Sequence, residues 1–207
     1  MPARSMRSKF HRREKLTMKQ LVNKIFVLVL VLSLALPVWA QETTIPFVPS
    51  PMVVVDRMLA LAEVEKDDII YDLGSGDGRI LIQAAKKYGA RGVGIDMNPK
   101  LVEEATRNAA EEKVSHLVQF RAADGLTVDI SDATVVTLYM FKWFNNQMRP
   151  KLQRLKVGSR VVAHDFGIDE WEPNKVENVD PKSDPTGELT HARTLYLWKV
   201  GTPPQVP

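Results

Sequence analysis

The chain of 207 residues is 44% apolar and 26% charged, which is typical of one globular domain with a short appendage. It contains no cysteine, so disulfides, thiolate zinc sites and a cysteine nucleophile are excluded. Of the formal charge of +3, residues 1–40 hold eight Lys or Arg against one acid, Glu14, so residues 41–207 carry −4. A mildly acidic globular part argues against a nucleic-acid partner, because such a partner needs a clustered basic surface.

The first 40 residues have the pattern of a targeting segment. A basic stretch ends at Lys24, an apolar run covers 25–36, and a short segment ending at Ala40 suits a signal peptidase. We expect a signal peptide, or an uncleaved membrane anchor, because a run extended to Ala40 approaches the roughly 20 residues of a bilayer span. The domain is then exported or membrane-anchored, with its N-terminal segment in contact with the membrane. An Arg-rich, acid-poor N-terminus is also typical of a mitochondrial presequence, and mitochondria are therefore the alternative location.

Residues 41–207 are expected to form the folded domain. Prolines keep the backbone extended as far as Pro51. Pro51 suits the first position of a helix, with Ser50 as its N-cap. Apolar residues at helical spacing predict that this helix runs to about Ala62.

Residues 69–80, with the sequence IIYDLGSGDGRI, carry the most informative motif of the chain. An apolar run ends in Asp72, three glycines follow at alternate positions, and an apolar-periodic stretch comes next. This pattern predicts a strand, a tight turn and a helix. Glycine lets a ligand approach the backbone, and the first turn of a helix offers unpaired N–H groups. The turn is therefore a candidate cradle for a flat, polar ligand.

The rest of the domain alternates between strands and helices. Strands are expected at 92–95, 117–121, 133–139 and 160–163, and helices at 80–88, 100–113 and 145–155. Pro150 predicts a break or a late start in the last of these helices. The segments 174–179 and 190–200 are expected to close the domain as an antiparallel pair. Five β/α alternations predict an α/β sheet that is parallel except at one edge and binds ligand at the carboxyl ends of its strands.

Two further acids extend the pattern of the glycine turn. Asp96 ends the second strand, 18 residues after Gly78, and is placed to accept hydrogen bonds from ribose hydroxyls, while Asp124 follows the third strand. The spacing G-x-G-x-G differs from the G-x-G-x-x-G of nicotinamide-binding turns. On these motifs, about 46–200 of the chain resembles the class I S-adenosylmethionine-dependent methyltransferases. The resemblance implies a Rossmann-like, doubly wound sheet of seven strands, mostly parallel with an antiparallel C-terminal strand, and S-adenosyl-L-methionine as cofactor.

The resemblance also implies a role for each matching residue. The glycine turn meets the methionine end of the cofactor with backbone N–H groups, and Asp72 or Asp77 meets its ammonium. Asp96 binds the ribose, Met97 packs on the adenine, and Asp124 accepts from the adenine amino group. Simpler roles stand beside two of these, a turn aspartate for Asp124 and ordinary packing for Met97. The implied cofactor-binding residues are Asp72, Gly74, Ser75, Gly76, Gly78, Asp96, Met97 and Asp124.

The acceptor chemistry is indicated by aromatic residues. They gather in the segments expected at the ligand edge, at Phe47, Tyr139, Phe141, Trp143, Phe144, Phe166 and Trp171. Holding a free lysine neutral at pH ~7.4 costs roughly 4 kcal/mol, and an apolar channel lowers the pKa of the amine by desolvation. The four histidines stand at no metal-ligand spacing, so no metal site is predicted.

A finer resemblance is to the small protein-lysine methyltransferases of mitochondria, which act on the ATP synthase c subunit and the adenine nucleotide translocator, and to their bacterial relatives. It rests on FVPSP at 47–51, YDLGSGDGRI at 71–80, MRPKL at 148–152 and RVVAHDF at 160–166. The resemblance implies N-methylation of lysine residues and therefore a protein substrate. Membrane proteins are among the substrates that it implies.

The acceptor-side base is the least defined part of the site. Asp165 and Tyr139 are the candidates, each with a purely orienting role as the alternative, and His164 is expected to be structural. A small-molecule methyltransferase and an exported domain that binds S-adenosylmethionine without turnover are the alternative functions. An export signal also conflicts with a cytosolic cofactor, because the basic flank favours the N-terminus inside and hence the domain outside.

Overall fold

The computed structural model describes residues 17–19, 22–23, 26 and 47–203. The predicted targeting segment, residues 1–40, lies almost wholly outside the described residues. Within the described part of the chain, no helix is both long and apolar enough to cross a bilayer. The chain divides into two units, Met1–Pro46 and Phe47–Pro207, and the sheet belongs to the second.

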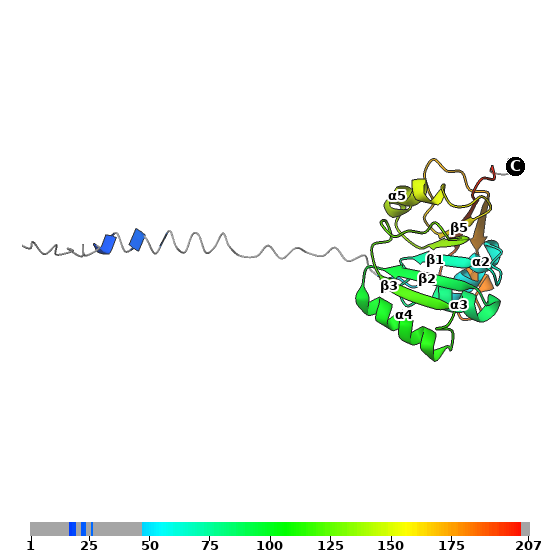
Figure 1. Cartoon of the computed structure of the whole chain (residues 1–207), viewed down its shortest axis with the longest axis horizontal. Helices are drawn as coiled ribbons and strands as arrows, with labels where there is room; N and C mark the ends of the chain where they lie inside the picture. The colour runs from blue at the N-terminus through cyan, green and yellow to red at the C-terminus, as the bar shows by residue number, and fades with distance from the viewer. Residues whose placement is uncertain (1–16, 20–21, 24–25, 27–46, 204–207) are drawn as a thin grey trace, which may run out of the picture. The chain divides into compact units, whose positions relative to one another are not determined.

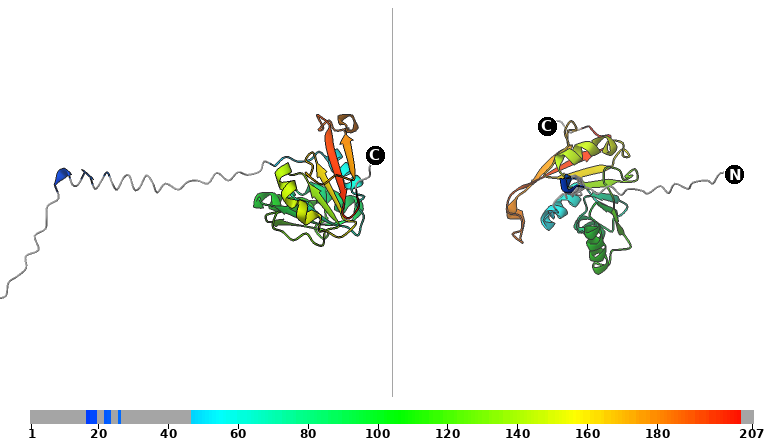
Figure 2. Two further views of the ribbon diagram at one scale, coloured as in Figure 1. Left: turned by 90° about the horizontal axis from the view of Figure 1, so that it is seen from above. Right: turned by 90° about the vertical axis from the view of Figure 1, so that its left-hand side faces the viewer.

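A seven-stranded sheet forms the centre of the second unit (Figure 1). Its strands lie in the order β3-β2-β1-β4-β5-β7-β6. The first five strands in the chain pair in parallel, while β7 is antiparallel to both β5 and β6. This confirms the predicted Rossmann-like, doubly wound sheet with an antiparallel C-terminal edge, and Figure 2 shows β6 and β7 in orange and red at that edge. The strands are β1 (Ile69–Leu73), β2 (Arg91–Asp96), β3 (Val118–Ala122), β4 (Val135–Leu138), β5 (Arg160–His164), β6 (Lys175–Val179) and β7 (Arg193–Lys199).

Helices cover both faces of the sheet because each sheet face carries its own apolar cluster. Buried side chains of α2 (Met52–Leu61), α3 (Arg79–Tyr88) and α4 (Pro99–Glu111) share one cluster with β1, β4 and β5. Those of α5 (Lys142–Leu152) share the other cluster with the buried Trp198 of β7. A short 3₁₀ helix, η1 (Pro181–Ser183), lies between β6 and β7.

Two helix starts differ from the sequence prediction. The last helix begins at Lys142 rather than Asn145 and continues through Pro150 to Leu152. The predicted break at Pro150 is wrong because this residue falls in the final turn, where its missing N–H removes one helical hydrogen bond close to the natural end. The predicted N-cap at Ser50 is also wrong, since α2 begins after Pro51 without a side-chain cap.

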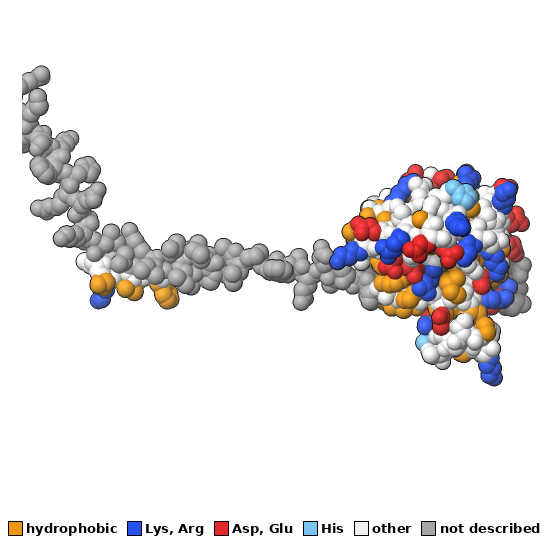
Figure 3. Space-filling view, turned by 90° about the horizontal axis from the view of Figure 1, so that it is seen from below, with side chains coloured by type: hydrophobic (Ala, Val, Ile, Leu, Met, Phe, Trp, Pro, Cys, Tyr) orange, Lys and Arg blue, Asp and Glu red, His pale blue; other side chains and the backbone are white. Residues whose placement is uncertain are grey.

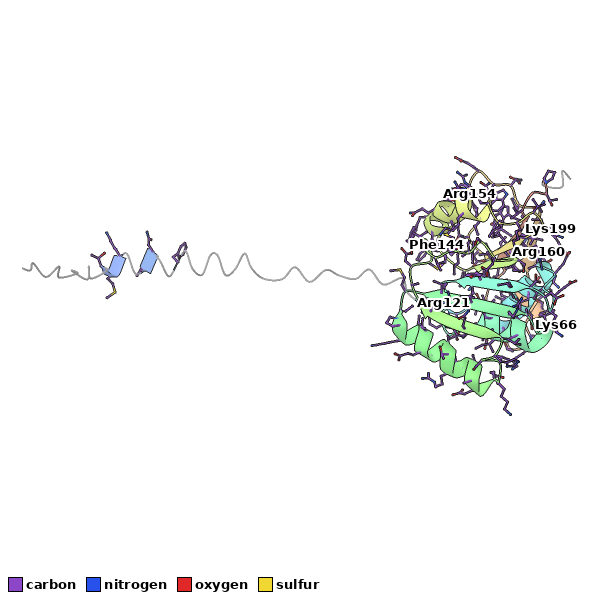
Figure 4. The ribbon with its side chains drawn as sticks, in the orientation of Figure 1. Lys66, Arg121, Phe144, Arg154, Arg160 and Lys199 are labelled. Atoms are coloured by element: carbon purple, nitrogen blue, oxygen red, sulfur yellow. The ribbon has the colours of Figure 1, made fainter. Side chains whose placement is uncertain are left out.

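The two ends of the parallel strands have different characters. At the amino ends, the Arg160 side chain donates to Asp68 at 2.6 Å and to the carbonyl of Ala62 at 2.9 Å, which ties β5 to the segment entering β1. In Figure 4, Arg160 lies toward this edge, whereas Phe144 and Arg121 lie toward the opposite edge. That opposite edge, at the carboxyl ends, holds the glycine turn and the predicted site residues.

Candidate functional site

The glycine turn between β1 and α3 takes a backbone conformation that only glycine adopts easily. Gly74, Gly76 and Gly78 have φ of 84°, 52° and 82°. The N–H groups of Gly74 and Ser75 donate to the Ile95 carbonyl of β2, at 2.8 and 3.0 Å. The turn is thus held against the end of β2, and these donors already have acceptors within the chain.

Two side chains lie directly against the turn. A Cβ on Gly76 would clash with the ring of Phe47, and a Cβ on Gly74 would clash with Met140. Phe47 precedes α2 and Met140 follows β4, so the segments before α2 and after β4 both pack against the turn. Glycine is therefore required here by the close approach as well as by the positive φ.

Asp72 is the acid best placed to receive a cation. It is 2% exposed, and its Oδ1 accepts a hydrogen bond of 2.7 Å from Thr137. Its Oδ2 is buried and has no partner, as is Ser75 Oγ close to it in the chain. Burial raises the pKa of the Asp72 carboxyl to about 7, and the nearby charges of Asp96 and Asp77 add to that increase. A buried carboxylate oxygen without a donor fits an ammonium ligand.

Asp77, the other acid expected near the ammonium, is occupied by a neighbouring side chain. The Arg79 guanidinium donates to both of its carboxylate oxygens, at 3.0 Å from Nε and 2.6 Å from Nη2. The third nitrogen of Arg79 donates to the Ser50 carbonyl at 2.9 Å. Arg79 therefore fastens the segment before α2 to the glycine turn, and Asp72 is left as the acid with a free oxygen.

Asp96 points toward the glycine turn. Its Oδ2 accepts from the Gly76 N–H at 3.0 Å and its Oδ1 from the Asn98 N–H at 2.8 Å. Met97 follows with 70% of its surface exposed. The Asp124 Oδ1 accepts from Leu126 N at 2.9 Å, which is the turn role expected as its simpler alternative. Asp96 and Asp72 thus flank the turn, while Asp124 also serves its own loop.

An aromatic cluster lies beyond the ends of β4 and β5. The Tyr139 ring stacks on His164 with centroids 3.9 Å apart and on Phe166 at 6.3 Å. Phe141 meets Phe166 edge to face at 5.8 Å and is 40% exposed. Burial raises the pKa of the Tyr139 phenol, so the neutral phenol is favoured. Of the aromatic residues predicted for the acceptor side, Tyr139, Phe141 and Phe166 thus form one contiguous cluster.

Asp165 is held by the opposite strand rather than left free. Its Oδ2 lies 2.7 Å from Arg193 Nη1, and its Oδ1 accepts from the Thr194 N–H at 3.0 Å. Its φ of 60° is unusual for a residue other than glycine and turns the chain out of β5. A carboxylate with these partners is suited to orienting neighbouring groups. To act as a base, Asp165 would have to give up its ion pair with Arg193.

Several site features were not expected from the sequence. The Ser50 hydroxyl lies 2.9 Å from His164 Nδ1, and Arg193 pairs with Asp165. Two predicted aromatic residues pack with the core instead: Phe144 is 4% exposed, and the partly buried Trp171 packs against Trp198. Among the described residues, no group of three His, Asp or Glu side chains is placed to hold a metal ion.

Known proteins with similar sequences are methyltransferases. The ANTKMT methyltransferase domain matches residues 72–175. A protein-lysine N-methyltransferase of Saccharolobus islandicus is 42% identical over 159 residues, which covers 76% of this chain and 94% of that protein. The lysine N-methyltransferase of the ATP synthase c subunit from Xenopus laevis is 34% identical over 68% of this chain, which spans 62% of that protein.

The fold also matches that of a solved structure with a bound nucleoside. The crystal structure of an RNA methyltransferase from Salinibacter ruber, in complex with S-adenosyl-L-homocysteine, has a TM-score of 0.66 and 47% identity, covering 77% of this chain and 97% of that one. The face of the present molecule drawn in Figure 3 carries acidic and basic side chains interspersed rather than a single basic field.

Proposed function

The chain belongs to the ANTKMT methyltransferase domain family, and we propose that it transfers the methyl group of S-adenosyl-L-methionine to the side-chain amine of lysine residues in proteins. The observation that carries this proposal is the combination of a glycine turn, an unpartnered Asp72 oxygen and Asp96 at one edge of the sheet. The lysine acceptor is supported by the names of the Saccharolobus and Xenopus relatives.

We assign the cofactor-side residues from their chemistry. Asp72 Oδ2 would accept from the ammonium of S-adenosylmethionine, and the methionine end would lie beside the glycine turn that Phe47 and Met140 pack against. Asp96 would bind the ribose hydroxyls. The adenine would lie beside Asp124 and Met97, of which Met97 is 70% exposed. When bound, S-adenosylmethionine supplies a methyl group already activated by its sulfonium.

The acceptor side must orient a neutral amine. Tyr139, Phe141 and Phe166 form an apolar aromatic surface, and such surroundings disfavour a charged ammonium. Asp165 does not leave a bare negative charge beside them, because Arg193 pairs with it at 2.7 Å. We therefore propose that Tyr139 and Asp165 orient the lysine side chain, and that alignment provides most of the rate enhancement.

RNA is the second candidate acceptor, because the Salinibacter ruber neighbour is described as an RNA methyltransferase. The charge distribution disfavours it, since residues 41–207 carry a formal −4 and nucleic-acid binding relies on clustered Lys and Arg. A small-molecule acceptor, or binding without turnover, are the further alternatives.

One experiment separates these acceptors. The full chain is incubated with methyl-labelled S-adenosylmethionine and a membrane extract, and the label is followed through protease, ribonuclease and small-molecule fractions. We expect protein-bound label that acid hydrolysis releases as methyllysine. Label that is sensitive to ribonuclease would replace lysine by RNA, and cofactor binding without transfer to any fraction would indicate a non-catalytic domain.

We further propose that the acceptor is a membrane protein and that the domain faces the compartment containing S-adenosylmethionine. The apolar run at 25–36 would place the domain near a membrane, and the Xenopus relative is named for a component of ATP synthase. Use of this cofactor favours an anchored domain on the cytosolic side or a mitochondrial domain over an exported one.

A further inference from the structure

His164 is a fully buried polar side chain at the acceptor edge. The ring is 0% exposed, and burial lowers its pKa to about 4, so the imidazole is neutral near pH 7. Its Nε2 has no hydrogen-bond partner, and the closest acidic atom is Asp165 Oδ2 at 3.5 Å. A buried nitrogen without a partner destabilises a folded protein, and an apolar ring would avoid that loss. The imidazole is therefore expected to do something that a phenyl ring does not.

The other ring nitrogen connects two distant parts of the chain. His164 Nδ1 lies 2.9 Å from the hydroxyl of Ser50, which is 114 residues away in sequence and 4% exposed. The Ser50 carbonyl accepts from Arg79, which also clamps Asp77 in the glycine turn. Through Ser50, the end of β5 is thus tied to the segment that carries Phe47 onto Gly76.

The flat face of the same imidazole supports the aromatic acceptor surface. Its centroid lies 3.9 Å from that of Tyr139 with the planes 24° apart, a closer contact than Tyr139 makes with Phe166. Tyr139 is half-buried, and the hydrogen bond to Ser50 limits how far the imidazole can rotate beneath it. Ser50 therefore holds the ring on which Tyr139 stacks.

We propose that His164 is a positioning residue, which fixes the Tyr139 ring at the acceptor side and links it through Ser50 to the glycine turn. This rests on the proposed function, because the acceptor role of Tyr139 is part of that proposal. His164 itself contacts neither reacting group in this assignment. Its effect is to keep the aromatic acceptor surface in a fixed position relative to the glycine turn.

The decisive variant is Ser50→Ala. It removes the hydrogen-bond partner of His164 Nδ1 and leaves the side chains of His164 and Tyr139 unchanged in the sequence. Its matched control is Ser159→Ala, because Ser159 is also a buried serine, 3% exposed, with one side-chain hydrogen bond, to the Ala133 carbonyl, near the amino ends of the strands. A second variant, His164→Asn, keeps a polar atom near the Nδ1 position and removes the stacked ring.

The first measurement is independent of activity. In the full chain labelled with ¹³C-tyrosine, the Tyr139 ring signal is identified among the four tyrosines by Tyr139→Phe. We expect Ser50→Ala to shift or broaden that signal, and Ser159→Ala to leave it unchanged. An unchanged Tyr139 signal in Ser50→Ala overturns the coupling.

The second measurement is methyl transfer to poly-L-lysine. Ser50→Ala and His164→Asn should each lower kcat about tenfold with little change in the KM for S-adenosylmethionine, because misalignment affects the transfer step. Wild-type kcat in both variants would contradict the positioning role. A wild-type chain that labels no protein in the membrane extract, while the Tyr139 signal responds to Ser50→Ala, would overturn the proposed function and leave the coupling supported.

Discussion

Asp72 shows how one buried side chain connects stability with ligand binding. The folded domain holds a carboxyl group with a raised pKa, one oxygen bonded to Thr137 and the other without a donor. Without a cation, burial favours the protonated form. An ammonium beside the free oxygen favours the ionised form, so cofactor binding should release a proton from this group.

The stability of the free protein should therefore carry a pH signature of Asp72. In the unfolded chain the carboxyl ionises near its ordinary pKa of 3.8, whereas in the folded protein it keeps its proton to about 7. Stability falls as pH rises between these values, by up to roughly 1.4 kcal/mol per pH unit. Asp72→Asn should remove this fall, as measured by denaturant unfolding at pH 4.5–8.

The difference between wild type and variant is the required readout, because His164 acts in the opposite direction. Burial lowers the pKa of His164 from 6.5 to about 4, so its contribution to stability is lost as pH falls through that range. Both proteins retain this effect. Parallel pH profiles for wild type and Asp72→Asn would show that Asp72 is already ionised in the free protein.

Asp96 should contribute to cofactor affinity through its charge and its two acceptor oxygens. We expect Asp96→Asn to weaken S-adenosylmethionine binding at least about tenfold by calorimetry, since hydrogen bonds to a charged group are worth about 1.5–3 kcal/mol. Asp129→Asn is the control, because Asp129 accepts a comparable turn hydrogen bond from Ser131 N at 2.9 Å. Equal losses in the two variants would mean that the Asp96 effect is a turn effect.

At the scale of elements, the sequence predicts what depends on local pattern. Apolar runs place each strand to within a few residues, and the glycines place the turn before α3. The pairs Ser50–His164 and Asp165–Arg193 could not be predicted, because they join residues 114 and 28 positions apart whose approach depends on the finished sheet. The mistaken helix cap at Ser50 has the same cause: local chemistry favours that role, and only the fold brings His164 within reach.

The glycine turn allows the effect of close packing to be separated from that of backbone strain. Gly76→Ala introduces a positive-φ alanine and a clash with Phe47, whereas Gly158→Ala, at φ 90°, has open space around the new Cβ. Each should lose about 1–2 kcal/mol from the backbone conformation. Only Gly76→Ala should also lose cofactor binding by calorimetry. Retained affinity in Gly76→Ala would remove the turn from the proposed site.

At the scale of the whole molecule, the amino and carboxyl ends of the parallel strands should have different roles. We expect the amino ends to contribute stability and the carboxyl ends to bind ligand. Arg160 and Asp68 form an ion pair at 2.6 Å with side chains 16% and 8% exposed, at the end away from the glycine turn. Burial raises the pKa of Asp68, but hydrogen bonds from Arg160 and Thr134 outweigh it and give a net lowering. The ionised pair thus fastens the start of β5 to the entry of β1.

Removing Arg160 should lower stability and leave chemistry intact. Arg160→Met leaves a buried carboxylate without its cation and should destabilise the domain by about 3 kcal/mol in denaturant unfolding. At temperatures where the variant is folded, its affinity for S-adenosylmethionine should match that of the wild type. If Arg160→Met weakened the affinity for S-adenosylmethionine and left stability unchanged, the roles assigned to the two ends of the strands would be wrong.

For the membrane-anchored domain proposed above, we expect the catalytic domain on the side of the membrane where S-adenosylmethionine is made. A domain that uses S-adenosylmethionine needs access to the compartment where that metabolite is made, while a basic N-terminal flank alone favours translocation of the residues after the apolar run. The cysteine-free sequence offers a direct measurement, because a single Val157→Cys, at a residue 82% exposed, is the only thiol in the chain. In spheroplasts of a bacterial host, we expect this thiol to react with a membrane-impermeant maleimide only after lysis. Labelling of intact spheroplasts would place the domain outside and require the exported alternative.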